Sequence, residues 1–312
     1  MSSTATRAIV TGTTKPRVAA RGWRRFEPLL WLGPVLILLF GIVVYPMFEM
    51  LRTAFSEISR AGLDRGLAGF ENFTRLLTHP DLGHVLWQTL MWLVLVVGLT
   101  LVVSWPIALL LHQDFPGRTL VRYAVIVPWA ASLVMTSLIF RWMFHYYYGA
   151  INSVLVSTGI TPRPIDWLGS PVMAWIALIA VGVFVSVPFT SYVLLSGLQS
   201  IPAEVYEAAK IDGAGHLKTW FFITRPMLAG SVLVALALNI VGVFNSFPII
   251  WLITQGGPNR ATHTTITFMY ELAFKNRSIG EAAALSLLNL IVLMLIVVVY
   301  LRFQRKNAGG LL

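Results

Sequence analysis

The chain has 312 residues, of which 57% are hydrophobic and only 12% are charged. A soluble domain usually has about 25% charged residues, so much of this surface is predicted to face lipid. The absence of cysteine excludes disulfides, thiolate metal sites and thiol catalysis. The net charge of +10 comes from Lys and Arg near the termini and in short loops. That distribution suits membrane insertion, and no basic stripe with interleaved aromatic residues indicates nucleic-acid binding.

Apolar runs long enough to cross about 30 Å of hydrocarbon as helices recur along the chain. The first run lacks a small-residue cleavage site and exceeds the apolar core of a signal peptide, so we interpret it as an uncleaved span. A transmembrane domain over 29–303 is flanked by a disordered basic tail, 1–28, and a short tail, 304–312. The sequence predicts an all-α membrane protein with about six spans, at 29–51, 85–111, 120–144, 172–195, 227–253 and 282–303.

The Lys and Arg residues also predict an orientation. With the N-terminus in the cytoplasm, the inner segments carry more of these residues than the outer ones. Most of the outer ones lie in longer loops, where the positive-inside rule is lenient. We therefore predict that both termini face the cytoplasm.

The predicted spans hold almost no ionisable residues. No Asp or Glu lies in mid-span, and His112 and Arg141 lie near span ends. Proton- or sodium-coupled carriers usually keep such groups inside the membrane. The chain also lacks the G-x-x-x-x-G-K-[ST] phosphate loop and the H-E-x-x-H and G-x-S-x-G motifs of hydrolytic enzymes. We expect no catalytic residues and no metal site, and a pore whose energy source is on another chain.

The predicted cytoplasmic loop 197–226 contains a helical pattern. Glu207 suits the positively polarised start of a helix, and Gly213 permits a sharp turn at its end. Ala208 and Ala209 form a face of small residues that another surface can approach closely. A second short helix is predicted to lead back to the membrane. An ordinary surface helix that joins two spans explains these residues equally well.

The spacing in this loop resembles the EAA loop of membrane subunits of binding-protein-dependent ABC importers. The pattern is Glu207-Ala208-Ala209, three residues, Gly213, nine residues, Ile223, two residues and Pro226. Arg225 departs from it, because the family usually has Leu before this proline. The resemblance implies that the loop docks in a cleft of an ATP-binding subunit, and the implied docking residues are Glu207, Ala208, Ala209, Asp212, Gly213, Ile223 and Pro226.

A second motif, Leu252-Ile-Thr-Gln-Gly-Gly-Pro258, resembles the L-T-x-G-G-P signature of maltose-type carbohydrate importers. Similar segments occur from about residue 29 to 302, at 44–46, 69–73, 127–129 and 280–286. This resemblance implies the type I ABC importer permease fold, in the cytoplasmic membrane of a bacterium or archaeon. It also implies a mono-, di- or oligosaccharide substrate. The implied partners are a second homologous permease, two ATP-binding subunits that bind ATP and magnesium, and an extracytoplasmic substrate-binding protein. No cofactor is expected in this chain.

A polar stripe in the fifth span is the candidate substrate pathway. Asn239, Gly242, Val243 and Ser246 lie on one helical face, with Asn245 beside it. Polar groups in lipid need a partner, so this stripe is predicted to face protein or water. Helix–helix packing explains it equally well, whereas the family resemblance implies that it lines the sugar site.

A second candidate set lies in the fourth span, where Pro188 interrupts helical hydrogen bonding beside Ser186 and Phe189. A sugar site needs amide or hydroxyl groups and an aromatic face, which these sets supply. Tyr146, Tyr147 and Tyr148 either contact a delivered sugar or belong to the aromatic belt.

Two alternatives remain open at this stage. A polyol or glycerol phosphate is the nearest competing substrate, although a phosphate favours Arg or Lys in the pathway and the spans offer only Arg141, near a span end. A secondary carrier is the rival class, and it has no need of an EAA-type loop.

Overall fold

The structure is a computed structural model that describes residues 27–308. Most of the predicted N-terminal tail, 1–26, and the last residues, 309–312, lie outside the described part. The chain divides into two units, 1–49 and 50–312. The helix α1 (Glu27–Leu38) continues through the π-helical segment η2 (Leu39–Val44) into α2 (Tyr45–Ala54), whose second half belongs to the second unit. Pro46 has no N–H for the Ile42 carbonyl, which accounts for the wide helical turns before it.

Five helical stretches in the described residues are long and apolar enough to cross a membrane. Three of them are α4 (Leu82–His112), α8 (Pro171–Gln199) and α15 (Ile279–Ala308), and the others cover Trp31–Ala54 and Ala229–Ile253. The helix pair α5 (Arg118–Ala130) and α6 (Leu133–Met143) makes a sixth span if it is counted as one. The all-α membrane fold with about six spans is therefore confirmed.

Two of the predicted spans are broken. The chain bends by 94° between α5 and α6, where Pro128 in the last turn removes a helical hydrogen bond and Ala131 is extended. The fifth span divides into α12 (Ala229–Phe244) and α13 (Phe247–Ile253). Pro248 accounts for this break, because it has no N–H for the carbonyl of Phe244. At the second break the N–H groups of Asn245, Ser246 and Phe247 donate to nearby carbonyls, so the chain turns there with local hydrogen bonds.

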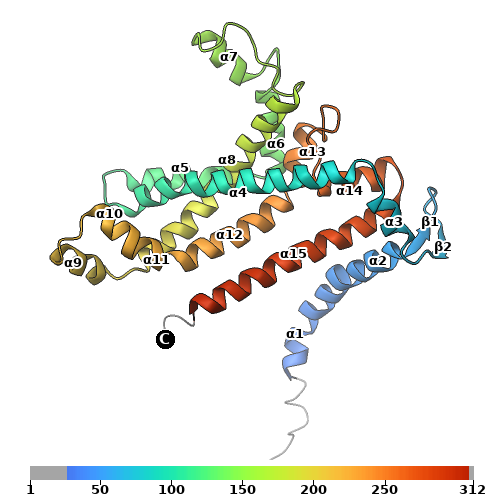
Figure 1. Cartoon of the computed structure of the whole chain (residues 1–312), viewed down its shortest axis with the longest axis horizontal. Helices are drawn as coiled ribbons and strands as arrows, with labels where there is room; N and C mark the ends of the chain where they lie inside the picture. Colours follow the sequence, from blue (N-terminus) through green and yellow to red (C-terminus); the bar gives the residue numbers. More distant parts are fainter. Residues whose placement is uncertain (1–26, 309–312) are drawn as a thin grey trace, which may run out of the picture. The chain divides into compact units, whose positions relative to one another are not determined.

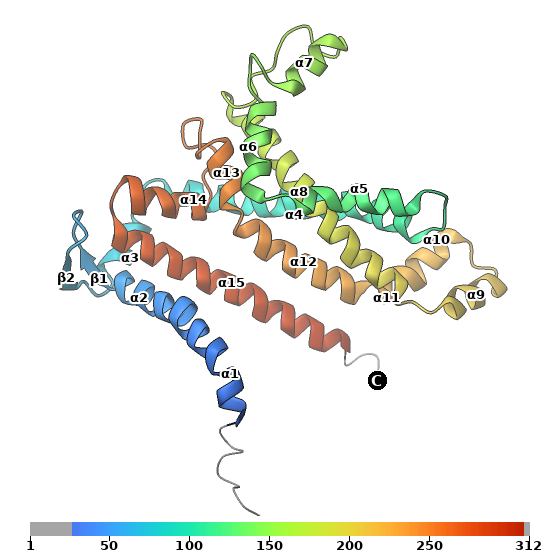
Figure 2. The same cartoon turned by 180° about the vertical axis from the view of Figure 1, so that it is seen from behind.

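Three apolar clusters hold the second unit together, and Figures 1 and 2 show the helices that build them. The first joins α4, α8 and α12 around Trp92, which is 1% exposed. The second joins the start of α15 to α3 (Glu71–Leu77) and α14 (Thr265–Tyr270) around Leu76 and Phe268. The third lies at the other end of α4 and α8 around Leu111. Burial of such side chains supplies the close packing that fixes neighbouring helices.

The connections add short elements at both ends of these helices. A hairpin of β1 (Ser56–Ile58) and β2 (Asp64–Leu67) was not predicted. It is held by Asn72, whose buried Nδ2 donates to the carbonyls of Ala54 and Ser56 at 3.0 and 2.8 Å. The remaining segments are α7 (Ala150–Ser157), α9 (Ala203–Ile211), α10 (His216–Thr219), η3 (Trp220–Thr224), α11 (Arg225–Met227) and η4 (Glu271–Lys275).

Candidate functional site

A pocket of about 230 Å³ lies among α4, α5, α6, α8, α12 and α13. Of the predicted pathway residues, all except Asn245 and Pro188 line it. Its walls are formed by Trp92, Trp129, Leu133, Gly182, Val185, Ser186, Phe189, Leu238, Asn239, Gly242, Val243, Ser246 and Ile249. The two sets that the sequence places on separate spans therefore converge on one site.

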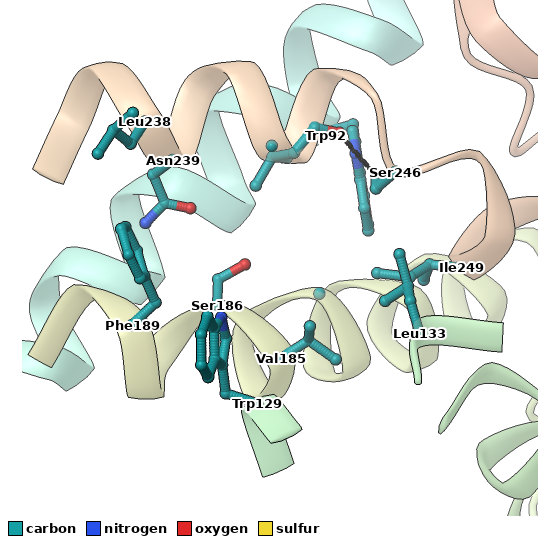
Figure 3. Close-up of a pocket in the computed structure, with 13 residues that line it drawn as sticks. Trp92, Trp129, Leu133, Val185, Ser186, Phe189, Leu238, Asn239, Ser246 and Ile249 are labelled. Carbon is teal, nitrogen blue, oxygen red and sulfur yellow. Dashed lines mark hydrogen bonds between the residues drawn. The ribbon is translucent and has the colours of Figure 1, made fainter. Parts of the chain in front are cut away.

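The polar side chains of the pocket come from α8, from α12 and, with Ser246, from the start of α13. The Asn239 Nδ2 donates to Thr190 Oγ1 at 2.7 Å, and the Thr190 hydroxyl donates to the Ser186 carbonyl at 2.9 Å. Figure 3 shows the side chains of Asn239 and Ser186 pointing toward each other across the pocket. Asn239 therefore takes part both in helix packing and in the pocket. Its amide nitrogen joins α12 to α8, and its side chain also lines the pocket.

Aromatic rings form much of the rest of the lining. Trp129 and Phe189 stack with centroids 6.3 Å apart and an interplanar angle of 22°. The buried Trp92 donates from Nε1 to the Val243 carbonyl at 3.0 Å and to Ser246 Oγ at 3.1 Å. No charged side chain is among the described residues that line the pocket. The site therefore offers ring faces and neutral hydrogen-bonding groups, which suit an uncharged hydroxylated ligand.

Two of the predicted pathway residues do not line the pocket. Asn245, which was expected beside the polar face, is exposed, and its Nδ2 donates to the Val241 carbonyl at 2.9 Å. Its amide is therefore bonded back to α12, while the next residue, Ser246, lines the pocket. Pro188 is buried on another side of α8, where it lines an apolar groove together with Pro128.

Sequence reasoning missed several lining residues, and Trp92 is the most important. Its neighbours in sequence are as apolar as it is, so nothing distinguishes this ring from Trp residues of the aromatic belt. Gly182 lies directly against it, since a β-carbon added there would be 2.8 Å from Trp92 Cη2. Only the packing of α4 against α8 identifies this pair.

The predicted helix of loop 197–226 is confirmed as α9, which ends in a local hydrogen-bonded motif. Gly213 has φ of 72°, and its N–H donates to the Lys210 carbonyl at 3.1 Å. The N–H of Ala214 donates to the Ala209 carbonyl at 2.9 Å. These two bonds form a Schellman motif, which requires the left-handed backbone that glycine adopts at least cost. The predicted second helix is present as α10 and η3.

The exposed face of this loop differs from the prediction in one respect. Ala209 is only 5% exposed, so it packs inside this chain and does not form an accessible face with Ala208. Ala208 lies on the surface beside three other predicted docking residues, and Ile211 adds an apolar side chain that is 86% exposed. Arg225 is also exposed. The exposed predicted docking residues are Glu207, Ala208, Asp212, Gly213 and Pro226, whereas Ile223 is half-buried.

Comparison with known proteins matches residues 101–308 to the family described as the binding-protein-dependent transport system inner membrane component. The sulfoquinovosyl glycerol transport system permease of Agrobacterium fabrum is 34% identical over 91% of this chain and 92% of its own length. The trehalose/maltose transport system permease of Thermococcus litoralis is 30% identical over 95% of this chain and 97% of its own length.

The chain belongs to this family of transport permeases. A crystal structure of a bacterial ABC transporter for the acidic polysaccharide alginate has the same fold, with a TM-score of 0.77 and 22% identity. The match covers 92% of this chain and 99% of that one. The permease is thus a multi-pass inner-membrane protein with the type I ABC importer fold, and it is the pore subunit of a binding-protein-dependent importer.

Proposed function

We propose that this permease conducts a neutral sugar through the pocket between α8 and α12. The observation that carries the proposal is the lining itself. Stacked Trp129 and Phe189 offer an aromatic surface for a pyranose ring, and the Asn239 amide and Ser186 hydroxyl offer uncharged polar contacts. The names of the two relatives, one for a sulfoquinovosyl glycerol system and one for a trehalose/maltose system, support a carbohydrate substrate.

We further propose that the chain works in a complex with a second homologous permease, two ATP-binding subunits and an extracytoplasmic binding protein. In this proposal α9 and both termini face the cytoplasm, and the exposed side chains of Glu207 and Asp212 contact an ATP-binding subunit. ATP and magnesium bind to those subunits, where hydrolysis takes place, and this chain has no catalytic role. Closure of the ATP-binding subunits moves α9, and the pocket opens to alternate sides of the membrane.

A polyol or glycerol phosphate is the second candidate substrate. The uncharged lining favours a sugar or a polyol over a phosphate ester, because a phosphate is best held by Arg, Lys or backbone N–H groups. A ring face distinguishes a sugar from a polyol, because only a pyranose presents one to Trp129 and Phe189.

ATP-dependent uptake in proteoliposomes that contain the whole complex tests the proposal, with sugars, polyols and glycerol phosphate offered in turn. Replacing Asn239 with Ala is expected to raise KM for the transported sugar by about tenfold. That change corresponds to about 1.4 kcal/mol, the size of one hydrogen bond. Asn245→Ala is the matched control, because the same amide lies outside the pocket, and it should change KM by less than twofold.

Three results would contradict the proposal. Uptake of glycerol phosphate in preference to every sugar and polyol would assign another substrate class. Equal effects of the Asn239 and Asn245 substitutions would show that the pocket is not the pathway. Transport by this chain without ATP-binding subunits would instead favour a secondary carrier.

A further inference from the structure

A cluster of ionisable side chains lies outside the pocket and has no part in the proposed transport mechanism. Arg260 bridges two carboxylates from different parts of the chain. One guanidinium nitrogen contacts Asp81, which precedes α4, and Nη2 lies 2.9 Å from Oε1 of Glu271, at the start of η4. The other oxygen of Glu271 is 2.8 Å from His263 Nε2. Glu271 and His263 are buried at 6% and 2% exposure, whereas the side chain of Arg260 is 49% exposed, so Arg260 reaches a buried pair from the surface.

Arg260 belongs to the loop 254–264, whose backbone is under strain. Gln255, Asn259 and Arg260 itself all have φ between 49° and 61°. Side chains larger than glycine rarely adopt this conformation unless the surrounding structure enforces it. The Arg260 bridge supplies such enforcement, because it fixes the loop to α4 on one side and to η4 on the other.

Two further side chains hold the loop at the next residue. The Gln88 Nε2 donates to the Ala261 carbonyl at 2.6 Å, and the Trp175 Nε1 donates to the same carbonyl at 2.8 Å. A shift of the Arg260 backbone therefore displaces the acceptor of Trp175. This links the charge cluster to a residue of α8.

Trp175 leads directly to the pocket. Its ring lies against that of Trp92, with centroids 6.1 Å apart, and Trp92 donates to Ser246 Oγ in the pocket wall at 3.1 Å. The contacts thus run without a gap from Arg260 through Ala261, Trp175 and Trp92 to Ser246. Arg260 and Ala261 are joined by the chain itself, and every later step is a hydrogen bond or a ring contact between buried or half-buried groups.

We propose that Arg260 is a positioning residue that sets the shape of the Trp92–Ser246 side of the pocket through the 254–264 loop. It does not contact the substrate. The effect of Arg260 on sugar transport rests on the proposed function, in which the pocket is the sugar pathway. The effect on geometry, namely that loss of Arg260 loosens this wall and not the opposite one, does not depend on any substrate.

The absence of native cysteine allows a direct test in the intact complex. Ser246→Cys places a reporter at a pocket residue that is 6% exposed and bonded to Trp92. Ser186→Cys makes the same change at a half-buried residue on the α8 wall of the pocket and is the control reporter. The rate at which a small thiol reagent modifies each cysteine in this chain is then compared with and without Arg260→Ala.

We expect Arg260→Ala to raise the modification rate at Ser246→Cys by about fivefold and to leave Ser186→Cys within about 1.5-fold, because local opening of a packed region exposes the residues packed in it. Trp175→Phe, which removes the bond to Ala261, should have a similar effect, and the two together should not add. Arg260→Lys should restore most of the protection. Arg163→Ala, at an exposed arginine without a hydrogen bond or ion pair in the described part of the chain, should change neither rate.

Unchanged modification at Ser246→Cys in both Arg260→Ala and Trp175→Phe would overturn the proposal. Equal increases at both reporters would also overturn it, because they indicate general loosening. In uptake assays, Arg260→Ala should raise KM and leave the maximal rate within twofold. If the wild-type complex transports no sugar, the proposed function fails, and the modification rates still decide the role of Arg260.

Discussion

The loop that contains α9 and the loop 254–264 both connect helices at an end of the bundle, yet they differ in what holds them. The end of α9 is closed by hydrogen bonds between residues that are neighbours in sequence, namely Lys210, Gly213 and the residues beside them. The 254–264 loop also has internal hydrogen bonds, but side chains from α4, α8 and η4 bond to it as well. A projecting element that moves as a unit needs internal support, whereas a loop that shapes a pocket needs support from the helices around it.

The largest effect is expected in the locally supported loop. Gly213→Pro removes the N–H that bonds to Lys210 and forces φ to about −65°, against 72° in the structure. The end of α9 is then lost, and we expect ATP-driven uptake to fall to background while the complex still assembles. Uptake measured together with co-purification of the ATP-binding subunits checks this result.

Gly215→Ala is the matched control for that variant. The N-cap glycine of α10 has φ of −69°, and a β-carbon there meets no atom within 4 Å. Uptake should stay within twofold of wild type. Normal uptake by a Gly213→Pro complex would show that transport does not need the Schellman motif at the end of α9. The α9 loop would then not depend on local support.

A smaller effect is expected where support comes from another helix. Gln88→Leu removes the donor to the carbonyls of Arg260 and Ala261, at 3.2 and 2.6 Å. Because Trp175 still bonds to Ala261, we expect a loss of about 2 kcal/mol, and no more. Thermal unfolding of the purified complex, with protease cleavage in the 254–264 loop as a local probe, measures it.

Gln199→Leu makes the same chemical change at an exposed residue at the end of α8. It should alter stability by less than about 0.5 kcal/mol. If the two leucine variants behave alike, the 254–264 loop does not depend on α4, and the comparison with the α9 loop fails at that point.

The smallest expected effect concerns pH. Burial lowers the pKa of His263, and nearby Arg260 and Lys275 lower it further, while Glu271 opposes them. The unfolded chain therefore binds this proton more readily than the folded one. Stability from the neutral imidazole is complete above pH about 6.5 and is lost as pH falls from there toward the lower folded pKa.

We accordingly expect the Tm of the wild-type complex to fall by a few degrees more than that of His263→Gln between pH 7.5 and 5.5. His216→Gln, at an exposed histidine of α10, should reproduce the wild-type curve. Parallel curves for wild type and His263→Gln would remove His263 from the pH response.

The sequence alone predicted the features that depend on residues close together in the chain. Long apolar runs predicted the spans, because each must satisfy its own backbone hydrogen bonds in lipid. The end of α9 followed from glycine at position 213, since few other residues accept a left-handed backbone. The spacing of Asn239, Gly242 and Ser246 likewise predicted a shared face, and all three residues line the pocket.

Only the tertiary structure decided the features that depend on distant partners. Ala209 is as small as Ala208 but packs inward, Trp92 is buried whereas Trp129 is 54% exposed, and Asn245 lies outside the pocket that Asn239 lines. The bond from Trp175 to Ala261 joins residues that are 86 positions apart. In a chain that is apolar almost throughout, hydropathy does not distinguish a side chain that faces lipid from one that faces another helix, so helix packing determines which residues meet.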